Sequence, residues 1–273
     1  MRVGVVGAGR MGRPMVARLV DAGHAVRALG RSVEARAALV DIGATAVGEA
    51  TEVTEGADVV LVCVHDDEQV RAVCLHGGLI ERMPAGAVLV VHTTGSPRVV
   101  EDIAARGVTV VDAPVSGSPQ DIAAGRVTLF AGGSSDAVEH ARPALVSYSD
   151  PVLHVGDLGA GQHVKLLNNS LFAAHIGLLG EAVRCGRKWG VREEVLLDAL
   201  AHGSAASYAL TRVAPRGSVV AFTVAVAEFL GKDMAVARKV AAELGAELGA
   251  IDAAVTALPR EFVHDTSTIT APP

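Results

Sequence analysis

A glycine-rich loop between a short β-branched run and a helical pattern constrains the fold of this chain more than any other feature. The run is Arg2–Val6, and the loop after it reads Gly7-Ala8-Gly9-Arg10-Met11-Gly12. Apolar residues then recur at helical spacing as far as Gly23. In such a loop the first glycine permits a tight turn, the second lets the backbone approach a pyrophosphate, and the third lets helix pack on strand. The pattern predicts a dinucleotide-binding unit, against the alternative of a plain tight turn.

The residues after the second predicted strand bear on the choice of cofactor. This strand, His24–Leu29, ends in Gly30-Arg31-Ser32. An NAD site usually places an acidic residue about 20 positions beyond the glycine loop, and none is found there. Arg31 offers a guanidinium for a 2′-phosphate and Ser32 a hydroxyl beside it, so we expect NADP rather than NAD. The alternative is that Arg31 only begins an exposed turn.

Five further strand-like runs alternate with helical or turn stretches, which predicts a mostly parallel, doubly wound α/β sheet of the Rossmann type. The runs are Asp58–Val64, Ala87–Thr93, Val108–Asp112, Val127–Ala131 and Pro151–Val155.

Ligands of open α/β sheets bind at the carboxyl ends of strands, and three loops lie at such ends. We expect Val64 and His65 in one loop, and Thr94 in a second, to lie on the cofactor side, although the second loop, with its hydroxyls and Pro97, equally suits a plain helix start. The third loop follows Asp112-Ala113-Pro114-Val115. Ser116 and the backbone amides of Gly117 and Ser118 form a donor cluster there that suits a substrate carboxylate, although a helix cap would look similar.

A long uninterrupted helical pattern occupies Gly159–Val191 and predicts a helix over Gln162–Lys188, about 40 Å long at 1.5 Å per residue. Lys165 and Asn169 stand one turn apart on one face, so the asparagine can hydrogen-bond the lysine. The plain alternative is a solvated lysine at a helix start.

Beyond this helix the chain is expected to be all-helical, with helices over Glu193–His202, Thr223–Gly245 and Ala246–Leu258 and an irregular segment over Gly203–Ser218. Lys232 lies inside the most apolar of these helices, so it either faces solvent or reaches the ligand cleft. The polar end from His264 to Pro273 is expected to fray. We therefore expect a cofactor domain over 1–160, a connecting helix over 161–190 and a helical domain over 191–273.

Composition excludes several classes of protein. A net charge of −6 with 3% aromatic residues offers no surface for nucleic acid. No run reaches the roughly 18 apolar residues of a membrane span, and no secretion signal precedes the glycine loop, so a cytoplasmic protein is expected. Three cysteines without metal-type spacing predict reduced thiols and no metal site. The apolar helices of the second domain expose more than it can bury alone, which predicts a homodimer or homotetramer.

Four stretches together resemble the β-hydroxyacid dehydrogenase family, which includes 3-hydroxyisobutyrate dehydrogenases and tartronate semialdehyde (glyoxylate) reductases. They are Gly7–Gly12, Asp112–Gly117, Gly159–Asn169 and Lys232-Asp233. The resemblance implies a Rossmann-like domain, a long connecting helix and a helical domain that builds oligomers. It implies an enzyme that transfers hydride between nicotinamide and a small β-hydroxyacid or semialdehyde carboxylate, and Arg31-Ser32 make NADP the expected cofactor.

The resemblance also implies roles for single residues. Lys165 matches the family's acid/base, and Asn169 and Ser116 match residues that hold the substrate. Lys232 matches a lysine beside cofactor and substrate, and Thr94 a residue near the nicotinamide. The chain departs from the family pattern at Ser118, where glycine is usual, at Ile122, where alanine is usual, and at His65, where proline is common.

Hydride chemistry suits this set of residues, because an ammonium can stabilise and protonate the oxygen of a reduced carbonyl, and the neutral amine can accept the alcohol proton in oxidation. Two other functions stay open. An imine reductase shares the resemblance in fold but usually lacks the lysine, and an NADP-binding sensor would bind without turnover.

Overall fold

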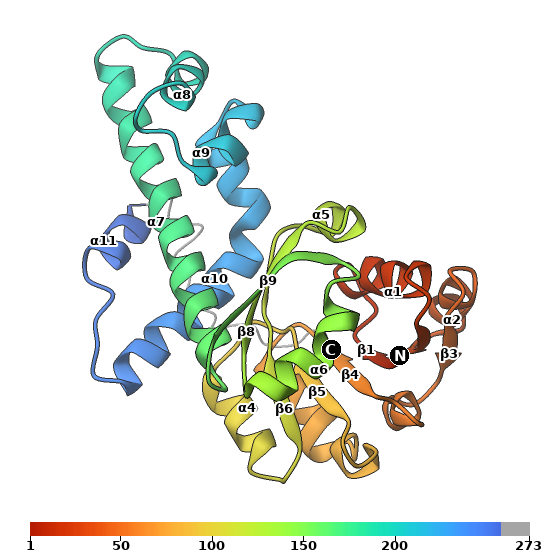
Figure 1. The fold of residues 1–273 in the computed structure, drawn as a ribbon. Coiled ribbons are helices and arrows are strands. Elements are labelled where there is room, and N and C mark those ends of the chain that lie inside the picture. The colour runs from red at the N-terminus through yellow and green to blue at the C-terminus, as the bar shows by residue number, and fades with distance from the viewer. Residues whose placement is uncertain (258–273) are drawn as a thin grey trace, which may run out of the picture. The chain divides into compact units, whose positions relative to one another are not determined.

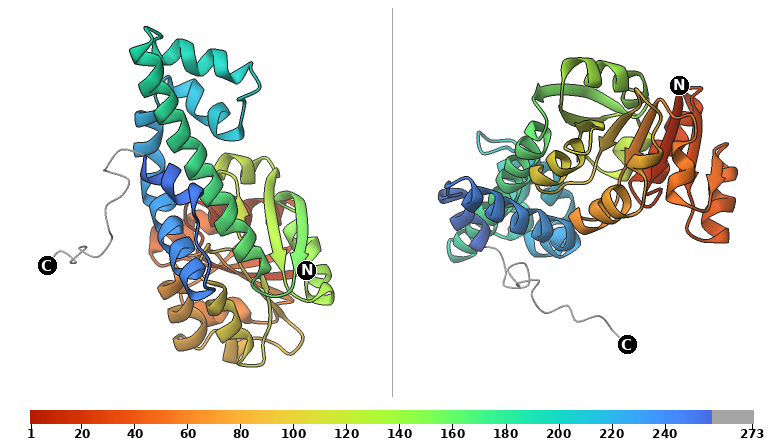
Figure 2. Two further views of the ribbon diagram at one scale, coloured as in Figure 1. Left: turned by 90° about the vertical axis from the view of Figure 1, so that its left-hand side faces the viewer. Right: turned by 90° about the horizontal axis from the view of Figure 1, so that it is seen from below.

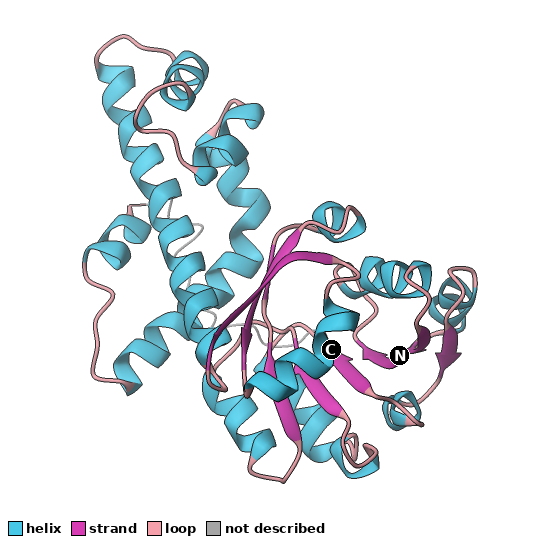
Figure 3. Ribbon diagram, viewed as in Figure 1, coloured by secondary structure: helices cyan, strands magenta, loops and turns pink. Residues whose placement is uncertain are grey.

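The computed structural model describes residues 1–257, and these divide into two compact units. The first is Met1–Lys165 and the second begins at Leu166, so the division falls inside one helix. Among the described residues, every strand belongs to the first unit (Figure 3). This is the predicted combination of a Rossmann-like α/β domain and a helical C-terminal domain.

One nine-stranded sheet forms the centre of the first unit (Figure 1). Its path runs β3-β2-β1-β4-β5-β6-β8-β7, with β9 paired to β8. The six strands from β3 to β6 are parallel, whereas β8 runs antiparallel to β6 and β7. The strands are β1 (Arg2–Val6), β2 (Ala25–Leu29), β3 (Thr45–Val47), β4 (Val59–Val62), β5 (Val88–Val91), β6 (Thr109–Asp112), β7 (Val115–Ser116), β8 (Val127–Gly132) and β9 (Ser149–Gly156).

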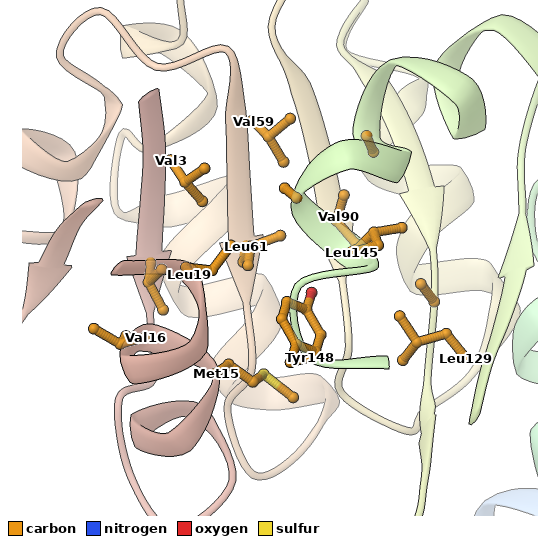
Figure 4. Packing of buried hydrophobic residues seen from close by; sticks show 14 of the residues in the cluster. Val3, Met15, Val16, Leu19, Val59, Leu61, Val90, Leu129, Leu145 and Tyr148 are labelled. Carbon is orange, nitrogen blue, oxygen red and sulfur yellow. The ribbon is translucent and has the colours of Figure 1, made fainter. Parts of the chain in front are cut away.

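The central strands are apolar throughout because both of their faces are covered. In β4 the alternate residues Val59 and Leu61 pack into one cluster, while Val60 and Val62 pack into another. Figure 4 shows the first cluster, which contains Val59 and Leu61 of β4 together with Met15 and Leu19 of the first helix. Burying one such valine or leucine side chain stabilises the folded state by roughly 1.5–3 kcal/mol relative to leaving it exposed.

Helices connect the strands and supply the two covering layers. They are α1 (Gly12–Asp21), α2 (Val33–Val40), α3 (Asp67–Arg71), α4 (Pro97–Ala104), α5 (Pro119–Ala123) and α6 (Ser135–Leu145), with short turns η1 (Ala50–Thr54), η2 (Ala72–His76) and η3 (Ile80–Arg82). Parallel strands need such crossovers because the end of one strand and the start of the next lie at opposite ends of the sheet. The crossovers leave the loops after β1, β4, β5 and β6 together at the carboxyl edge.

The second unit is built on a 29-residue helix, α7 (Ala160–Lys188), which begins in the first unit. It continues through α8 (Glu193–Ala201), α9 (Tyr208–Val213), η4 (Ala214–Arg216), α10 (Val219–Glu243) and α11 (Ala250–Thr256). Figures 1 and 2 show α7 alongside α10. Buried Ile176 and Leu179 of α7 share one apolar cluster with Phe222 and Leu230 of α10.

Some predicted boundaries were wrong for physical reasons. The segment Gly203–Ser218 is not irregular, because Ser207 caps α9 by accepting from the amide of Leu210. The helix expected from Thr223 begins earlier, at Val219, after the Ser218 cap. The helix expected over Ala246–Leu258 is observed only over Ala250–Thr256. Leu258 and the predicted frayed end lie outside the described residues. No helix within residues 1–257 has the length and apolar character that crossing a membrane requires.

Candidate active site

The loop between β1 and α1 contains three glycines, and the packing of the fold requires only two of them. Gly7 has φ +99°, and a Cβ there would lie 2.2 Å from the carbonyl oxygen of Cys63. A Cβ on Gly12 would lie 2.2 Å from the carbonyl oxygen of Gly7. A Cβ on Gly9 would meet nothing within 4 Å. Packing therefore explains the first and third glycines, while the exposed second one leaves open space for a ligand.

The α1 N-terminus adds hydrogen-bond donors to this space. Met11 stands at the N-cap position and makes no side-chain hydrogen bond to the first turn. The first amides of a helix lack intrahelical partners and carry a partial positive charge, so they bind phosphate oxygens. The loop therefore fits the diphosphate of a dinucleotide.

The turn after β2 contains an acidic residue that the sequence prediction missed. Ser32 caps α2 by accepting a hydrogen bond from the amide of Ala35, 3.1 Å away. Glu34 lies in the first turn of this helix, and hydrogen bonds from its own amide and from the Ser32 side chain lower the pKa of its carboxyl. Arg31 is exposed at the same turn, and Arg36 donates to the carbonyl oxygen of Gly30 at 2.9 Å. The turn thus contains two basic side chains, Arg31 and Arg36, and one acidic side chain, Glu34.

The loops after β4 and β5 are joined through one threonine side chain. The Oγ1 of Thr93 accepts from the amide of Val64 and donates to its carbonyl oxygen, both at 3.0 Å. Thr94 is half-buried beside it. His65 is exposed, and its amide donates to Oε1 of Gln69 at 3.1 Å. The structure therefore brings Val64 next to the Thr94 loop, as neighbouring strand ends require.

Two further side chains hold the Thr94 loop. The carboxylate of Asp67 accepts from the amide of Ser96 at 2.9 Å. The Gln162 amide accepts from the amide of Gly95 at 2.9 Å and donates to the carbonyl oxygen of Thr93 at 2.8 Å. The flanks of Thr94 are therefore bonded both to α3 and to the first turn of α7.

Asp112, at the end of β6, fastens the start of α7. Its two carboxylate oxygens accept from the amides of Gly159 and Gln162, each at 2.7 Å. The residue is fully buried. Burial raises the pKa of Asp112 to about 7, and hydrogen bonds from those two amides oppose that rise. The sequence motif that begins with Asp112 therefore contains the N-terminal anchor of α7.

The predicted donor cluster after β7 is smaller than expected. Ser116 is half-buried and Gly117 is exposed with φ +146°. The amide of Ser118 is not free, because it donates to the Asp121 carboxylate at 2.9 Å, and the Ser118 hydroxyl bonds the same oxygen. The expectation of a free Ser118 amide was wrong because a capping box at the start of α5 uses it.

On α7, Lys165 and Asn169 are one turn apart and are exposed by 7% and 5%. The alternative of a solvated Lys165 is therefore excluded. The Nδ2 of Asn169 donates to Oδ2 of Asp233 at 2.6 Å, and Oδ1 of Asp233 pairs with Nζ of Lys232 at 2.8 Å. That Oδ1 is buried and accepts no hydrogen bond of good geometry from the residues that the structure describes. Lys232 is thus held by a buried anion.

Sequence reasoning assigned no role to four supporting groups, which are the buried Gln162 and Asp233, the half-buried Asp67 and the exposed Glu34. A signal existed for Gln162, which is polar, lies on an apolar helix and stands three residues before Lys165. The others are ordinary acidic residues next to turns or lysines, and only their partners reveal them. Within residues 1–257 no group of three or more histidine, cysteine or acidic side chains is placed to hold a metal ion.

A Rossmann-type strand order, a glycine loop that accommodates a diphosphate and a buried lysine beyond the strand ends define a nucleotide-dependent dehydrogenase. Known proteins agree. Residues 2–156 match the NAD-binding domain of 6-phosphogluconate dehydrogenase, and residues 159–265 match the NAD-binding domain of NADP-dependent 3-hydroxyisobutyrate dehydrogenase. The chain therefore belongs to the β-hydroxyacid dehydrogenase family and is an NAD(P)-dependent dehydrogenase acting on a CH–OH group.

Relatives cover most of the chain. The 3-hydroxyisobutyrate dehydrogenase of Pseudomonas aeruginosa is 34% identical over 78% of this chain and 73% of its own length. The NAD-dependent L-serine dehydrogenase of the same organism is 31% identical over 86% and 80%. The structure of Mycobacterium tuberculosis 3-hydroxyisobutyrate dehydrogenase with L-serine is 26% identical, covers 93% of this chain and 91% of its own, and has a TM-score of 0.83.

Replacing Gly9 with alanine tests whether the loop binds a diphosphate. The added methyl meets no protein atom, so the thermal midpoint should not change, whereas NADP affinity should fall by at least about tenfold, or ~1.4 kcal/mol, because the methyl occupies the phosphate approach. Calorimetric titration and thermal unfolding measure the two quantities. Gly12→Ala is the control, because its methyl collides with the backbone and should lower the midpoint. Unchanged NADP affinity in Gly9→Ala would contradict this use of the loop.

Proposed function

We propose that the protein interconverts a short β-hydroxy carboxylate and the corresponding semialdehyde, using NADP, with Lys165 as the acid/base. The observation that carries the proposal is a buried lysine on a helix whose first turn is bonded to the strand ends at Thr93 and Asp112. When bound, the nicotinamide supplies or accepts the hydride. The chain's own residues must then bind the carboxylate and move one proton.

The substrate class follows from the chemistry common to the relatives' names. Relatives include a 3-hydroxyisobutyrate dehydrogenase, a 2-(hydroxymethyl)glutarate dehydrogenase and an L-serine dehydrogenase. Each named substrate has a primary alcohol on the carbon next to the one that bears a carboxylate. Ser116 and the amide of Gly117 are the donors that we assign to that carboxylate, since the Ser118 amide is already engaged.

Proton transfer is assigned to the Lys165 amine. In reduction its ammonium donates a proton to the carbonyl oxygen as hydride reaches the carbonyl carbon, which leaves an alcohol and a neutral amine. In oxidation the neutral amine accepts the alcohol proton. Asn169 provides an amide one turn further on, and its Nδ2 is oriented by Asp233.

Lys165→Met should lower kcat for semialdehyde reduction by about 10²–10⁴, the usual contribution of a general acid, with little change in NADPH affinity. NADPH absorbance measures turnover, and titration measures affinity. Lys165→Arg should restore little, because a guanidinium does not release a proton near neutral pH. A Lys165→Met enzyme that keeps more than about a tenth of parental kcat would rule out the role. If the parent turned over cyclic imines faster than any semialdehyde, the result would favour an imine reductase. If the parent turned over neither, it would favour an NADP-binding sensor.

Cofactor preference is proposed from charge at the turn after β2. Arg31 and Arg36 favour a 2′-phosphate, whereas Glu34 opposes it, and one relative is named NAD-dependent. An arginine–phosphate bond is worth roughly 1.5–3 kcal/mol, so Arg31→Ala should weaken NADP binding about ten- to a hundredfold and leave NAD binding unchanged. Glu34→Gln should tighten NADP binding. Calorimetric titration of both cofactors decides, and parental NAD binding as tight as NADP binding would refute the preference.

A homo-oligomer, most simply a dimer, is proposed from apolar side chains that the second unit leaves exposed. Exposed fractions of 38–63% are found for Leu167, Leu171, Leu178, Val220, Val224 and Phe229. Light scattering at micromolar concentration should give a mass well above the 27.9 kDa monomer, because a partner would cover this surface. Leu171→Glu should weaken assembly, whereas Val33→Glu in the first unit should not. A monomeric parent would contradict the proposal.

A further inference from the structure

Gln162 has a buried side-chain amide that makes two hydrogen bonds, both to the loop around Thr94. Its exposed fraction is 1%, and its side chain accepts from the amide of Gly95 and donates to the carbonyl oxygen of Thr93. Both partners are backbone groups, and they lie on either side of Thr94. A glutamine can make this pair of bonds because it carries a donor and an acceptor on one planar group.

The loop around Thr94 has little freedom to settle elsewhere. The Asp67 carboxylate accepts from the amide of Ser96, and a Cβ on Gly95 would lie 1.7 Å from Oδ1 of Asp67. The loop is therefore packed against Asp67 on one side and bonded to Gln162 on another. The two hydrogen bonds of the Gln162 side chain tie this loop directly to the first turn of α7.

The backbone of Gln162 is fixed independently of its side chain. Its amide donates to Oδ2 of Asp112, while the amide of Gly159 donates to Oδ1. Lys165 follows three residues later, on the next turn of the same helix. Lys165 is thus one helical turn from Gln162, and the Gln162 side chain is hydrogen-bonded to both residues that flank Thr94.

We propose that Gln162 is a positioning residue that sets the distance between the Lys165 amine and the Thr94 loop. The inference rests on the proposed function, in which hydride and proton reach the two ends of one carbonyl bond. Such a reaction is sensitive to position, and a misplacement of about 1 Å can cost about a hundredfold in rate. Most of the cofactor affinity is assigned to the loop at Gly7–Gly12 and the turn at Arg31, so loss of Gln162 should affect kcat more than cofactor binding.

A variant without either hydrogen bond separates positioning from packing. Gln162→Met keeps the length and most of the volume of the side chain but removes both bonds. We expect kcat for semialdehyde reduction to fall by about 10–100-fold with less than about a threefold change in NADPH affinity. With NADPH deuterated at the transferred position, the isotope effect on kcat should rise, since hydride transfer becomes the slower step.

Hydrogen exchange in the cofactor-free protein supplies a readout that does not depend on activity. The amide of Gly95 should exchange at least about tenfold faster in Gln162→Met than in the parent, because its acceptor is gone. Ser149→Ala is the matched control. Ser149 is 2% exposed, and its hydroxyl donates to the carbonyl oxygen of Leu145 in the same unit. It should lose comparable stability without these kinetic changes.

Gln162→Glu gives a second test, which remains informative even if the methionine variant folds poorly. Its protonated carboxyl can still accept from Gly95 and donate to Thr93, whereas its carboxylate would face the Thr93 carbonyl oxygen. The ratio of variant to parental kcat should therefore rise as pH falls, and the corresponding ratio for Gln162→Met should stay flat.

The outcomes distinguish this inference from the proposed function. If the parent reduces semialdehydes and Lys165→Met does not, while Gln162→Met keeps kcat within about twofold, the positioning role fails alone. Unchanged Gly95 exchange in Gln162→Met, or a flat pH ratio in Gln162→Glu, would likewise overturn the positioning role alone. If the parent reduces no carbonyl compound, the proposed function and this inference fail together.

Discussion

The attachment of the α7 N-terminus to the buried carboxylate of Asp112 is the interaction on which the rest of the structure depends. A helix of 29 residues begins there with amides that need acceptors, and the carboxylate at the end of β6 satisfies two of them. The partial positive charge of the helix terminus also favours a carboxylate. Neither Gly132 nor Gly161 has room for a side chain beside it, since an added Cβ would lie 2.5–2.8 Å from the carboxylate oxygens.

This attachment brings the first turns of α7, with Lys165, to the end of the sheet where the strand-end loops lie. The carboxyl edge of a parallel sheet collects loops from distant parts of the chain, and here those loops contain the glycines at 7–12 and Thr94. A helix fastened to the same edge brings its first turns with it, including Gln162 and Lys165. Residues separated by more than 150 positions in sequence, from Gly7 to Lys165, are thus supported by one sheet.

Asn169, Asp233 and Gln162 are buried polar residues that make side-chain hydrogen bonds, which distinguishes them from the exposed Arg31 and Glu34. Asn169 is oriented by Asp233, and Asp233 in turn pairs with Lys232. Burying such groups is costly unless each is bonded, so the arrangement fixes side-chain directions closely. The turn at Arg31 and Glu34 is exposed and has no comparable constraint.

The sequence by itself determined the class of fold, the phosphate loop and the long helix with its lysine. Apolar runs, glycine spacing and helical periodicity are local properties, and they predicted β1, β4, β5 and α7 to within a few residues. The helix α9 was missed because its capping serine lies in a stretch of small residues. Only the tertiary structure decided which donors are free and which carboxylates support the site. It assigned the Ser118 amide to Asp121 and the Gln162 side chain to the backbone on either side of Thr94. A polar side chain has many possible partners along a sequence, and folding selects among them by bringing distant backbone groups within hydrogen-bonding distance.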